Sequence, residues 1–218
     1  MQTEILPLKQ RRAQEKALAL LAAEQIIVAP TDTVYGLMGR FDSVTALERI
    51  YIAKGRPPYK GIITLIGHLD QLGQLTPLPL TPVARTLVEN FWPGGLTIIL
   101  PALPTLPATL TAGQATVGIR LPAHAGLCKL LQQSGPLAAT SANVSGGPDA
   151  NSADEALNQL SGLVPLILAD ADGRRNRDAR PSTIIDVSQP QEFPRIVRRG
   201  ALDGAINTVL YTVFGYAC

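Results

Sequence analysis

Helix-forming stretches and short apolar runs follow one another along the 218-residue chain. Residues 9–24 are mostly good helix formers, and their alanines and leucines supply one buried side, which predicts a first helix. Short runs at 25–29 and 62–66 read as strands, and the second is apolar nearly throughout, as expected for a strand buried on both faces. The further strands expected from similar runs are 96–100, 116–121, 137–140, 166–169, 183–187 and 195–199.

Capping signals set the limits of the later helices. Ser43 is placed as an N-cap and Gly55 as a C-terminal stop, and Thr81 with the following proline is typical of a helix start. Ser152 and Glu155 have the spacing of a capping box. The helices predicted in this way are 43–54, 81–90 and 152–160. Residues 125–133 and 202–214 are also interpreted as helices.

A basic turn joins the helix over 43–54 to the strand over 62–66. It holds Lys54, Arg56 and Lys60 within seven residues, and a glycine and two adjacent prolines prevent the helix from continuing. Like charges so close repel one another, which favours an anion opposite them, such as a phosphate. A solvated basic turn is the alternative, because Lys and Arg are usually exposed.

Two other places combine polar side chains with strand ends. Thr31, Asp32 and Thr33 follow the strand over 25–29, where they suit either the rim of a ligand site or an ordinary turn. Arg120 lies inside an apolar run with no acidic neighbour in sequence. Its partner would be a bound carboxylate or phosphate if the side chain is buried, and solvent if it faces outward.

Three remaining stretches have open interpretations. Trp92 precedes a proline and two glycines and is expected at a packing corner, with base stacking as the alternative. Residues 141–148 are small, hydroxylated and glycine-rich, which allows a ligand close to the backbone but is also common in loops. Residues 170–181 form a loop with four arginines, interpreted as solvated.

Composition limits the class of protein. A formal net charge of +2 does not indicate nucleic-acid binding by bulk charge. Cys128 and Cys218 are far apart, which suits a reducing compartment. No apolar stretch approaches the ~20 residues that span a bilayer, so a cytoplasmic protein without a membrane partner is expected. One domain, residues 1–218 with a core of about 15–205, is the preferred organisation, with no second C-terminal domain.

Several common functional motifs are absent. Neither the G-x-x-x-x-G-K-[ST] loop nor the G-x-G-x-x-G fingerprint occurs, and G-x-S-x-G is also missing. His68 and His124 lack partners at metal-ligand spacing, and no C-x-x-C is present, so no protein-bound metal is predicted.

Seven motifs in a fixed order nevertheless resemble the YrdC-like family, the threonylcarbamoyl-adenylate synthases. They are PTDTVYGL (30–37), KGRPPYKG (54–61), WPGGLT (92–97), VGIRLP (117–122), TSANVSG (140–146), STIID (182–186) and RRG (198–200). The resemblance extends over nearly the whole chain. It implies an α/β fold with a twisted mixed sheet, flanked by helices, around a deep basic cleft.

The resemblance also implies an activity, a nucleotidyltransferase reaction. L-Threonine, bicarbonate and ATP would form threonylcarbamoyl-AMP and pyrophosphate, and a downstream transferase would use the product to modify tRNA. A carbamate attacking the α-phosphate brings two anions together, so charge neutralisation and positioning would dominate catalysis. Mg²⁺ is expected through the ATP phosphates, because no carboxylate cage is evident.

The family's site residues transfer by position. The K-x-R and S-x-N pairs, taken as catalytic, are Lys54, Arg56, Ser141 and Asn143. ATP would contact Arg56, Lys60, Thr116, Asn143 and Arg198. Threonine or its carbamate would contact Thr33, Arg120, Ser141 and Ser182.

Two other functions remain as alternatives. One is a non-catalytic module that binds double-stranded RNA or tRNA, with the arginine-rich loop, longer than is usual in the family, as a contact. The other is a relative that makes a carbamoyl-adenylate from carbamoyl phosphate. The K-x-R and S-x-N pairs favour the synthase over the RNA module.

Overall fold

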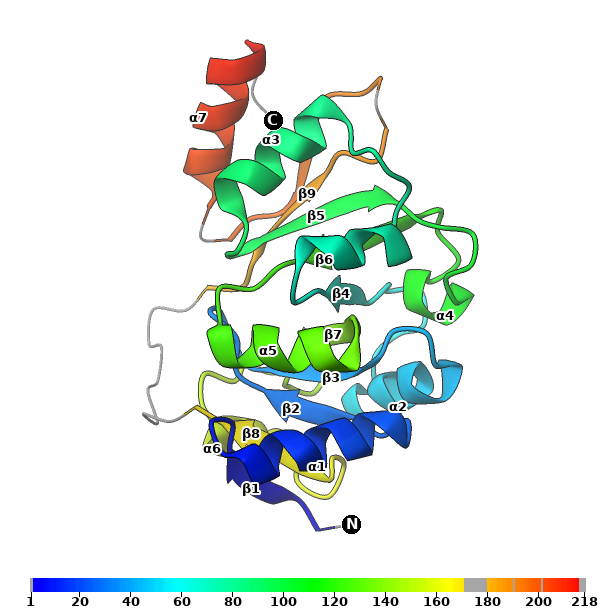
Figure 1. Cartoon of the computed structure of the whole chain (residues 1–218), viewed down its shortest axis with the longest axis vertical. Coiled ribbons are helices and arrows are strands. Elements are labelled where there is room, and N and C mark those ends of the chain that lie inside the picture. Colours follow the sequence, from blue (N-terminus) through cyan, green and yellow to red (C-terminus); the bar gives the residue numbers. More distant parts are fainter. Residues whose placement is uncertain (1, 171–179, 190, 201, 216–218) are drawn as a thin grey trace.

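The computed structural model describes residues 2–170, 180–189, 191–200 and 202–215, with the backbone alone at Asp203. Ten described strands form one mixed sheet in the order β1-β8-β2-β3-β7-β4-β6-β5-β9-β10. They are β1 (Glu4–Pro7), β2 (Ile27–Ala29), β3 (Gly36–Arg40), β4 (Ile63–Leu65), β5 (Leu96–Pro101), β6 (Thr116–Arg120), β7 (Leu137–Ser141), β8 (Leu166–Ala169), β9 (Thr183–Asp186) and β10 (Arg195–Arg198). The sheet runs the length of the molecule, with β1 near one end and α7 at the other (Figure 1).

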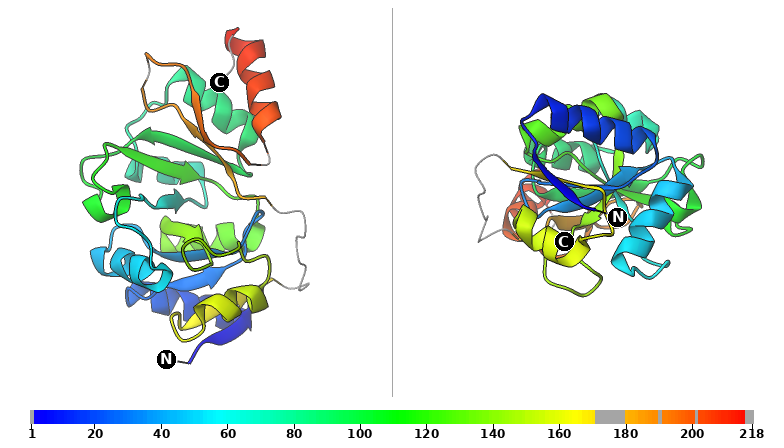
Figure 2. Two further views of the ribbon diagram at one scale, coloured as in Figure 1. Left: turned by 180° about the vertical axis from the view of Figure 1, so that it is seen from behind. Right: turned by 90° about the horizontal axis from the view of Figure 1, so that it is seen from below.

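Helices flank this sheet, so the predicted mixed α/β fold is confirmed. They are α1 (Arg11–Ala22), α2 (Val44–Lys54), the 3₁₀ helix η1 (Leu69–Gln74), α3 (Pro82–Phe91), α4 (Ala108–Thr111), α5 (Ala125–Ser134), α6 (Ala153–Leu160) and α7 (Asp203–Phe214). Helices α1 and α5 lie side by side on one face, and α3 packs with α7 at the end of the sheet (Figures 1 and 2). Among the described helices, none has both the length and the apolar character needed to cross a membrane.

Both faces of the sheet are buried at β2. In β2, Ile27 and Ala29 join a cluster with buried residues of α1 and α5, whereas Val28 joins the larger cluster on the opposite face. Successive side chains of a strand point to opposite faces, so a strand covered on both sides needs apolar residues in succession. This explains the continuous apolar runs of strands such as β2 and β8, whereas β10 at the edge of the sheet is largely exposed.

The predicted caps are present. The Ser43 hydroxyl accepts a hydrogen bond from the Ala46 amide at the start of α2, and Gly55 ends that helix in the left-handed region with φ 57°. The Thr81 hydroxyl accepts from the Ala84 amide in the same way. Ser152 caps α6, and the Glu155 carboxylate accepts from the amide of Asn151, the residue before the cap.

Four elements were not predicted: β1, β3, η1 and α4. Strand β3 is the most consequential, because it pairs with β2 on one side and with β7 on the other, both antiparallel. Its two glycines made it hard to predict from the sequence, since glycine disfavours strands. At Gly39 a Cβ would meet Ile26 at 3.1 Å and Ala46 at 3.3 Å, so the glycine allows α2 to approach the sheet closely.

Candidate functional site

A pocket of about 210 Å³ lies where strands from the middle of the sheet end. The first residue of β3, Gly36, and the last residues of β7 and β6, Ser141 and Arg120, all line it. Three guanidinium groups, those of Arg56, Arg120 and Arg198, line it, and no acidic residue or histidine is among the described residues that do so. The complete lining is Thr31, Thr33, Val34, Tyr35, Gly36, Arg56, Gly61, Ile63, Leu65, Arg120, Ala139, Thr140, Ser141, Pro181, Ser182, Ile184 and Arg198.

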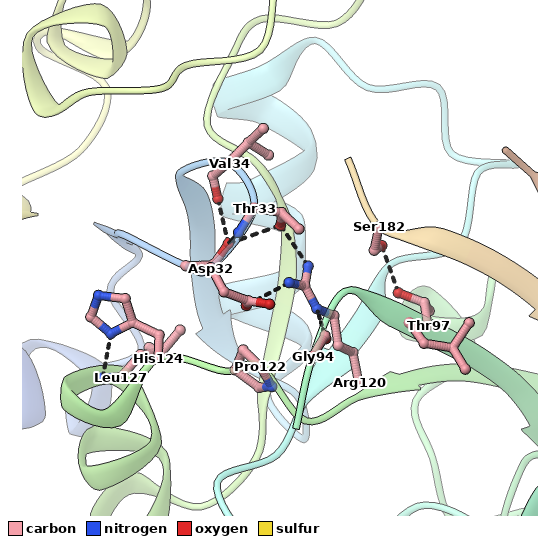
Figure 3. Close-up of polar contacts among 12 residues, drawn as sticks. Asp32, Thr33, Val34, Gly94, Thr97, Arg120, Pro122, His124, Leu127 and Ser182 are labelled. Carbon is pink, nitrogen blue, oxygen red and sulfur yellow. Dashed lines mark hydrogen bonds and ion pairs between the residues drawn. The ribbon is translucent and has the colours of Figure 1, made fainter. Parts of the chain in front are cut away.

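Arg120 is buried, with 4% of its surface exposed. Its Nη2 donates to Asp32 Oδ1 at 2.6 Å, its Nη1 to Thr33 Oγ1 at 2.7 Å and its Nε to the Gly94 carbonyl at 2.9 Å (Figure 3). Burial lowers the pKa of Arg120, and the Asp32 carboxylate opposes that change. The partner missing in the local sequence is therefore a carboxylate 88 positions away, and no bound anion is needed to explain why Arg120 is inside.

The basic turn does not hold its three cations together. Arg56 lines the pocket and is fixed by its own turn, because its Nε donates to the Lys60 carbonyl at 3.1 Å and its Nη2 to the Gly61 carbonyl at 2.7 Å. Burial lowers the pKa of Arg56. The Lys60 side chain is exposed and outside the pocket lining, and Lys54 is buried and also outside it.

Lys54 is a buried support for the loop after β7. Its Nζ donates to the carbonyls of Ser141 and Asn143, both at 2.6 Å, and to Asn143 Oδ1 at 3.1 Å. Burial lowers the pKa of Lys54 to about 8, with Arg56 contributing in the same direction. The Asn143 amide group in turn donates to the Val144 and Gly147 carbonyls at 3.0 and 2.7 Å. Lys54 and Asn143 thus hold the backbone of the glycine-rich loop through hydrogen bonds to its carbonyls.

The third arginine holds the start of β9. Arg198 donates from Nε and Nη2 to the Ser182 carbonyl at 3.0 and 2.8 Å, and from Nη2 to Ser182 Oγ at 2.9 Å. Ser182 Oγ is also 2.8 Å from Thr97 Oγ1 on β5 (Figure 3). Burial lowers the pKa of Arg198, which Asp149 opposes. The paired arginines at the end of β10 therefore include one that faces the pocket.

Of the ten residues predicted for the site, six line this pocket: Thr33, Arg56, Arg120, Ser141, Ser182 and Arg198. Lys54 and Asn143 do not line it, but Lys54 contacts Asn143 and the carbonyl of Ser141, which does. Thr116 begins β6, at the opposite end of that strand from Arg120, and with Lys60 it lies outside the lining. Arg174, Arg175 and Arg177 of the arginine-rich loop lie outside the described residues.

Sequence reasoning did not identify the partner of Arg120 or the apolar part of the pocket lining. Asp32 was singled out with its threonines but not as the partner of Arg120, because nothing local links residues 32 and 120. The apolar residues Ile63, Leu65 and Ala139 line the pocket yet read as ordinary core residues of strands. Trp92 proved to be a packing residue, buried and donating from Nε1 to the Leu96 carbonyl at 2.7 Å.

No metal centre is evident in the described part of the chain, where no group of three His, Cys, Asp or Glu residues could hold an ion. Asp32 is already paired with Arg120. The chemistry available in the pocket is therefore hydrogen bonding from guanidinium groups and hydroxyls, which suits ligands that carry several anionic oxygens.

Comparison with known families assigns the chain to one of them. The Sua5/YciO/YrdC family model, described as "Telomere recombination", matches residues 19–200. The chain belongs to this family. That match contains every residue predicted for the site.

Individual relatives have more specific names. The threonylcarbamoyl-AMP synthase of Bacillus subtilis is 38% identical over 189 residues, which cover 86% of this chain and 53% of that protein. The Escherichia coli protein of the same name is 35% identical over 186 residues, covering 84% of this chain and 96% of that protein. The crystal structure of Pyrococcus abyssi Sua5 complexed with L-threonine superimposes with a TM-score of 0.85 at 31% identity, over 99% of this chain and 61% of that one. The chain spans about half the length of the Bacillus subtilis relative.

Proposed function

We propose that this chain is an L-threonylcarbamoyladenylate synthase. In the proposed reaction, the threonine amine combines with bicarbonate to give a carbamate and water. A carbamate oxygen then attacks the α-phosphorus of ATP, and the bond to pyrophosphate breaks. The observation that carries the proposal is the convergence of Arg56, Arg120 and Arg198 on one pocket that no described acid lines.

Charge supports this chemistry. A carboxylate, a carbamate and a triphosphate repel one another, so cations fixed before binding lower the cost of bringing them together. Each of the three guanidinium groups is held by hydrogen bonds that it donates: Arg56 to its own turn, Arg120 to Thr33 and Arg198 to Ser182. No protein nucleophile is required, because the carbamate itself attacks.

The proposed roles follow the position of each group. Arg56 and Arg198 are proposed to face the nucleotide phosphates, together with Lys60 and Thr116 from outside the present lining. Thr33, Arg120, Ser141 and Ser182 are proposed to bind threonine or its carbamate. Lys54 and Asn143 are proposed to act by holding the loop that carries Ser141.

Mg²⁺ is proposed to enter with ATP, bound to its phosphates. The described residues provide no carboxylate cage for a resident ion, and Mg²⁺ commonly reaches such sites through substrate phosphates.

Pyrophosphate release from ATP tests the proposal. Release should require both L-threonine and bicarbonate, and should be much weaker with L-serine. Arg56→Ala should abolish most of it, whereas Arg85→Ala, an exposed arginine on α3, serves as the matched control and should retain it. No release under any combination would contradict the synthase.

The same experiment separates the alternatives. Release with carbamoyl phosphate in place of threonine and bicarbonate would indicate a carbamoyl-adenylate enzyme. Salt-sensitive binding of double-stranded RNA without any release would favour the RNA module. RNA binding and the downstream tRNA-modifying partner remain predictions. The arginine-rich loop, the proposed RNA contact, lies mostly outside the described residues.

A further inference from the structure

Thr97 is part of the WPGGLT motif but does not line the pocket. It lies on β5 with 0% of its surface exposed, and its hydroxyl is 2.8 Å from that of Ser182. Ser182 is also buried, with 2% exposed, yet it lines the pocket. A chain of polar groups therefore runs from the interior of the sheet at Thr97, through Ser182, to Arg198 at the rim (Figure 3 shows the Thr97–Ser182 contact).

The directions of these hydrogen bonds are restricted. A hydroxyl has one proton to donate and two lone pairs that accept, whereas a guanidinium only donates. Arg198 Nη2 therefore occupies one lone pair of Ser182 Oγ.

The direction of the hydrogen bond between Thr97 and Ser182 follows from the other partners available to the Thr97 hydroxyl. Among the described residues, the Thr97 hydroxyl has Ser182 Oγ as its hydrogen-bond partner. If Ser182 donated to Thr97, the Thr97 proton would be buried without an acceptor, which is unfavourable. The stable arrangement has Thr97 donating to Ser182.

We propose that Thr97 is a positioning residue that fixes the Ser182 hydroxyl as a hydrogen-bond donor into the pocket. With both lone pairs occupied, Ser182 can only donate, so it selects a ligand oxygen that accepts. The neighbouring Arg120 and Arg198, and the absence of acids from the described lining, make that oxygen an anionic one. A carboxylate or carbamate of the amino acid and a phosphate of the nucleotide share this chemistry.

This inference rests on the proposed function for the identity of the ligands, but its test is binding. Thr97→Val keeps the shape of the side chain and removes the donor, so Ser182 can rotate and donate elsewhere. Calorimetric titration should show about ten-fold weaker binding of the ligand that contacts Ser182. Weaker L-threonine binding would identify the carboxylate, and weaker ATP binding the phosphate. Thr97→Ser, which retains the hydroxyl, should bind as wild type.

Two comparisons separate positioning from a general loss of structure. In a Ser182→Ala background, Thr97→Val should cause no further loss, because Thr97 acts through Ser182. Thr64→Val is the matched control: Thr64 is on β4, 0% exposed, and its buried hydroxyl has no described partner. It should leave both affinities unchanged, and thermal unfolding should show that all variants fold.

The outcomes are distinct. Equal affinities of wild type and Thr97→Val for both ligands overturn the inference, even if pyrophosphate release is normal. An additional loss on top of Ser182→Ala also overturns it. Binding with the expected pattern but without pyrophosphate release overturns the proposed function and leaves the positioning role. A wild-type protein that binds neither L-threonine nor ATP overturns both.

Discussion

Arg120 illustrates how one buried charge organises the residues around it. Its three donors reach a carboxylate, a hydroxyl and a carbonyl from two separate segments, the turn at 32–33 and Gly94. The guanidinium is thus fixed in place before any ligand arrives. Its substitution has a structural consequence as well as a functional one, because Asp32 would lose the partner that balances its charge.

Arg120→Ala should lower the free energy of unfolding by about 3 kcal/mol, as expected when one member of a buried ion pair is removed. Adding Asp32→Asn should recover part of that loss, since the unpaired carboxylate disappears, while activity stays low. Urea denaturation of the two variants measures this. A single variant as stable as wild type would mean that the pair contributes only what exposed pairs do.

The buried Lys54 should make the stability of the fold depend on pH. Its folded pKa of about 8 lies below the 10.5 of the unfolded chain, so between these values the unfolded state binds more protons. The contribution of Lys54 to stability should therefore rise as pH increases from about 8 to about 10.5.

Comparison of wild type with Lys54→Met in urea at pH 7, 8.5 and 10 measures that contribution. The difference in unfolding free energy should increase with pH in favour of wild type. A difference that falls would mean that the carbonyls of Ser141 and Asn143 hold the proton more strongly than burial expels it.

At the level of elements, α2 connects the stability of the fold to the geometry of the site. Ser43 caps its first turn and also donates to Glu24 Oε1 at 2.7 Å, and Gly55 ends the helix just before Arg56. Lys54, in the last turn, reaches the loop after β7. The two ends of this one helix therefore have separate roles.

Ser43→Ala should reduce unfolding free energy by about 1 to 2 kcal/mol, because it leaves a buried helix amide and the Glu24 carboxylate without their partner. The affinity for ATP should not change, since the far end of α2 is held by its own contacts. Thermal unfolding and ATP titration together check this, and Thr81→Ala on α3 is the matched cap control. A large change in ATP affinity would show that the two ends are coupled.

In the whole molecule, the pocket is assembled from strands that are distant in sequence and adjacent in the sheet. Strands β3, β7, β4 and β6 are neighbours in the sheet order, and β9 and β10 bring Ser182 and Arg198 from the far side of β5. These strands and the residues beside them supply guanidinium and hydroxyl groups to the pocket. The described residues include no cluster of carboxylates, histidines or cysteines that could bind a metal ion.

Treatment with EDTA should therefore leave the melting temperature of the ligand-free protein unchanged, because the described residues offer no site at which an ion could stabilise the fold. It should nevertheless stop pyrophosphate release by removing Mg²⁺ from ATP, and added Mg²⁺ should restore it. A marked drop in melting temperature with EDTA alone would reveal a structural ion and contradict the view that Mg²⁺ enters with the nucleotide.

Local signals explain what could be predicted from the chain alone. The caps at Ser43, Gly55 and Thr81 act within a few residues, so the limits of α2 and α3 were predictable. Strand β3 was missed because its pairing with β2 and β7, and not its own composition, makes it a strand. The family motifs pointed to ten site residues, of which six line one pocket in the structure.

The contacts between those motifs could not be predicted in this way. Lys54 and Arg56 are two residues apart, yet one supports the loop at 141–143 and the other lines the pocket. Arg120 pairs with Asp32, which is 88 positions away in the sequence, and Ser182 is hydrogen-bonded to Thr97, which is 85 positions away. Sequence patterns report backbone preference and burial over short distances, whereas the direction and partner of a buried polar group depend on which strands the sheet places side by side.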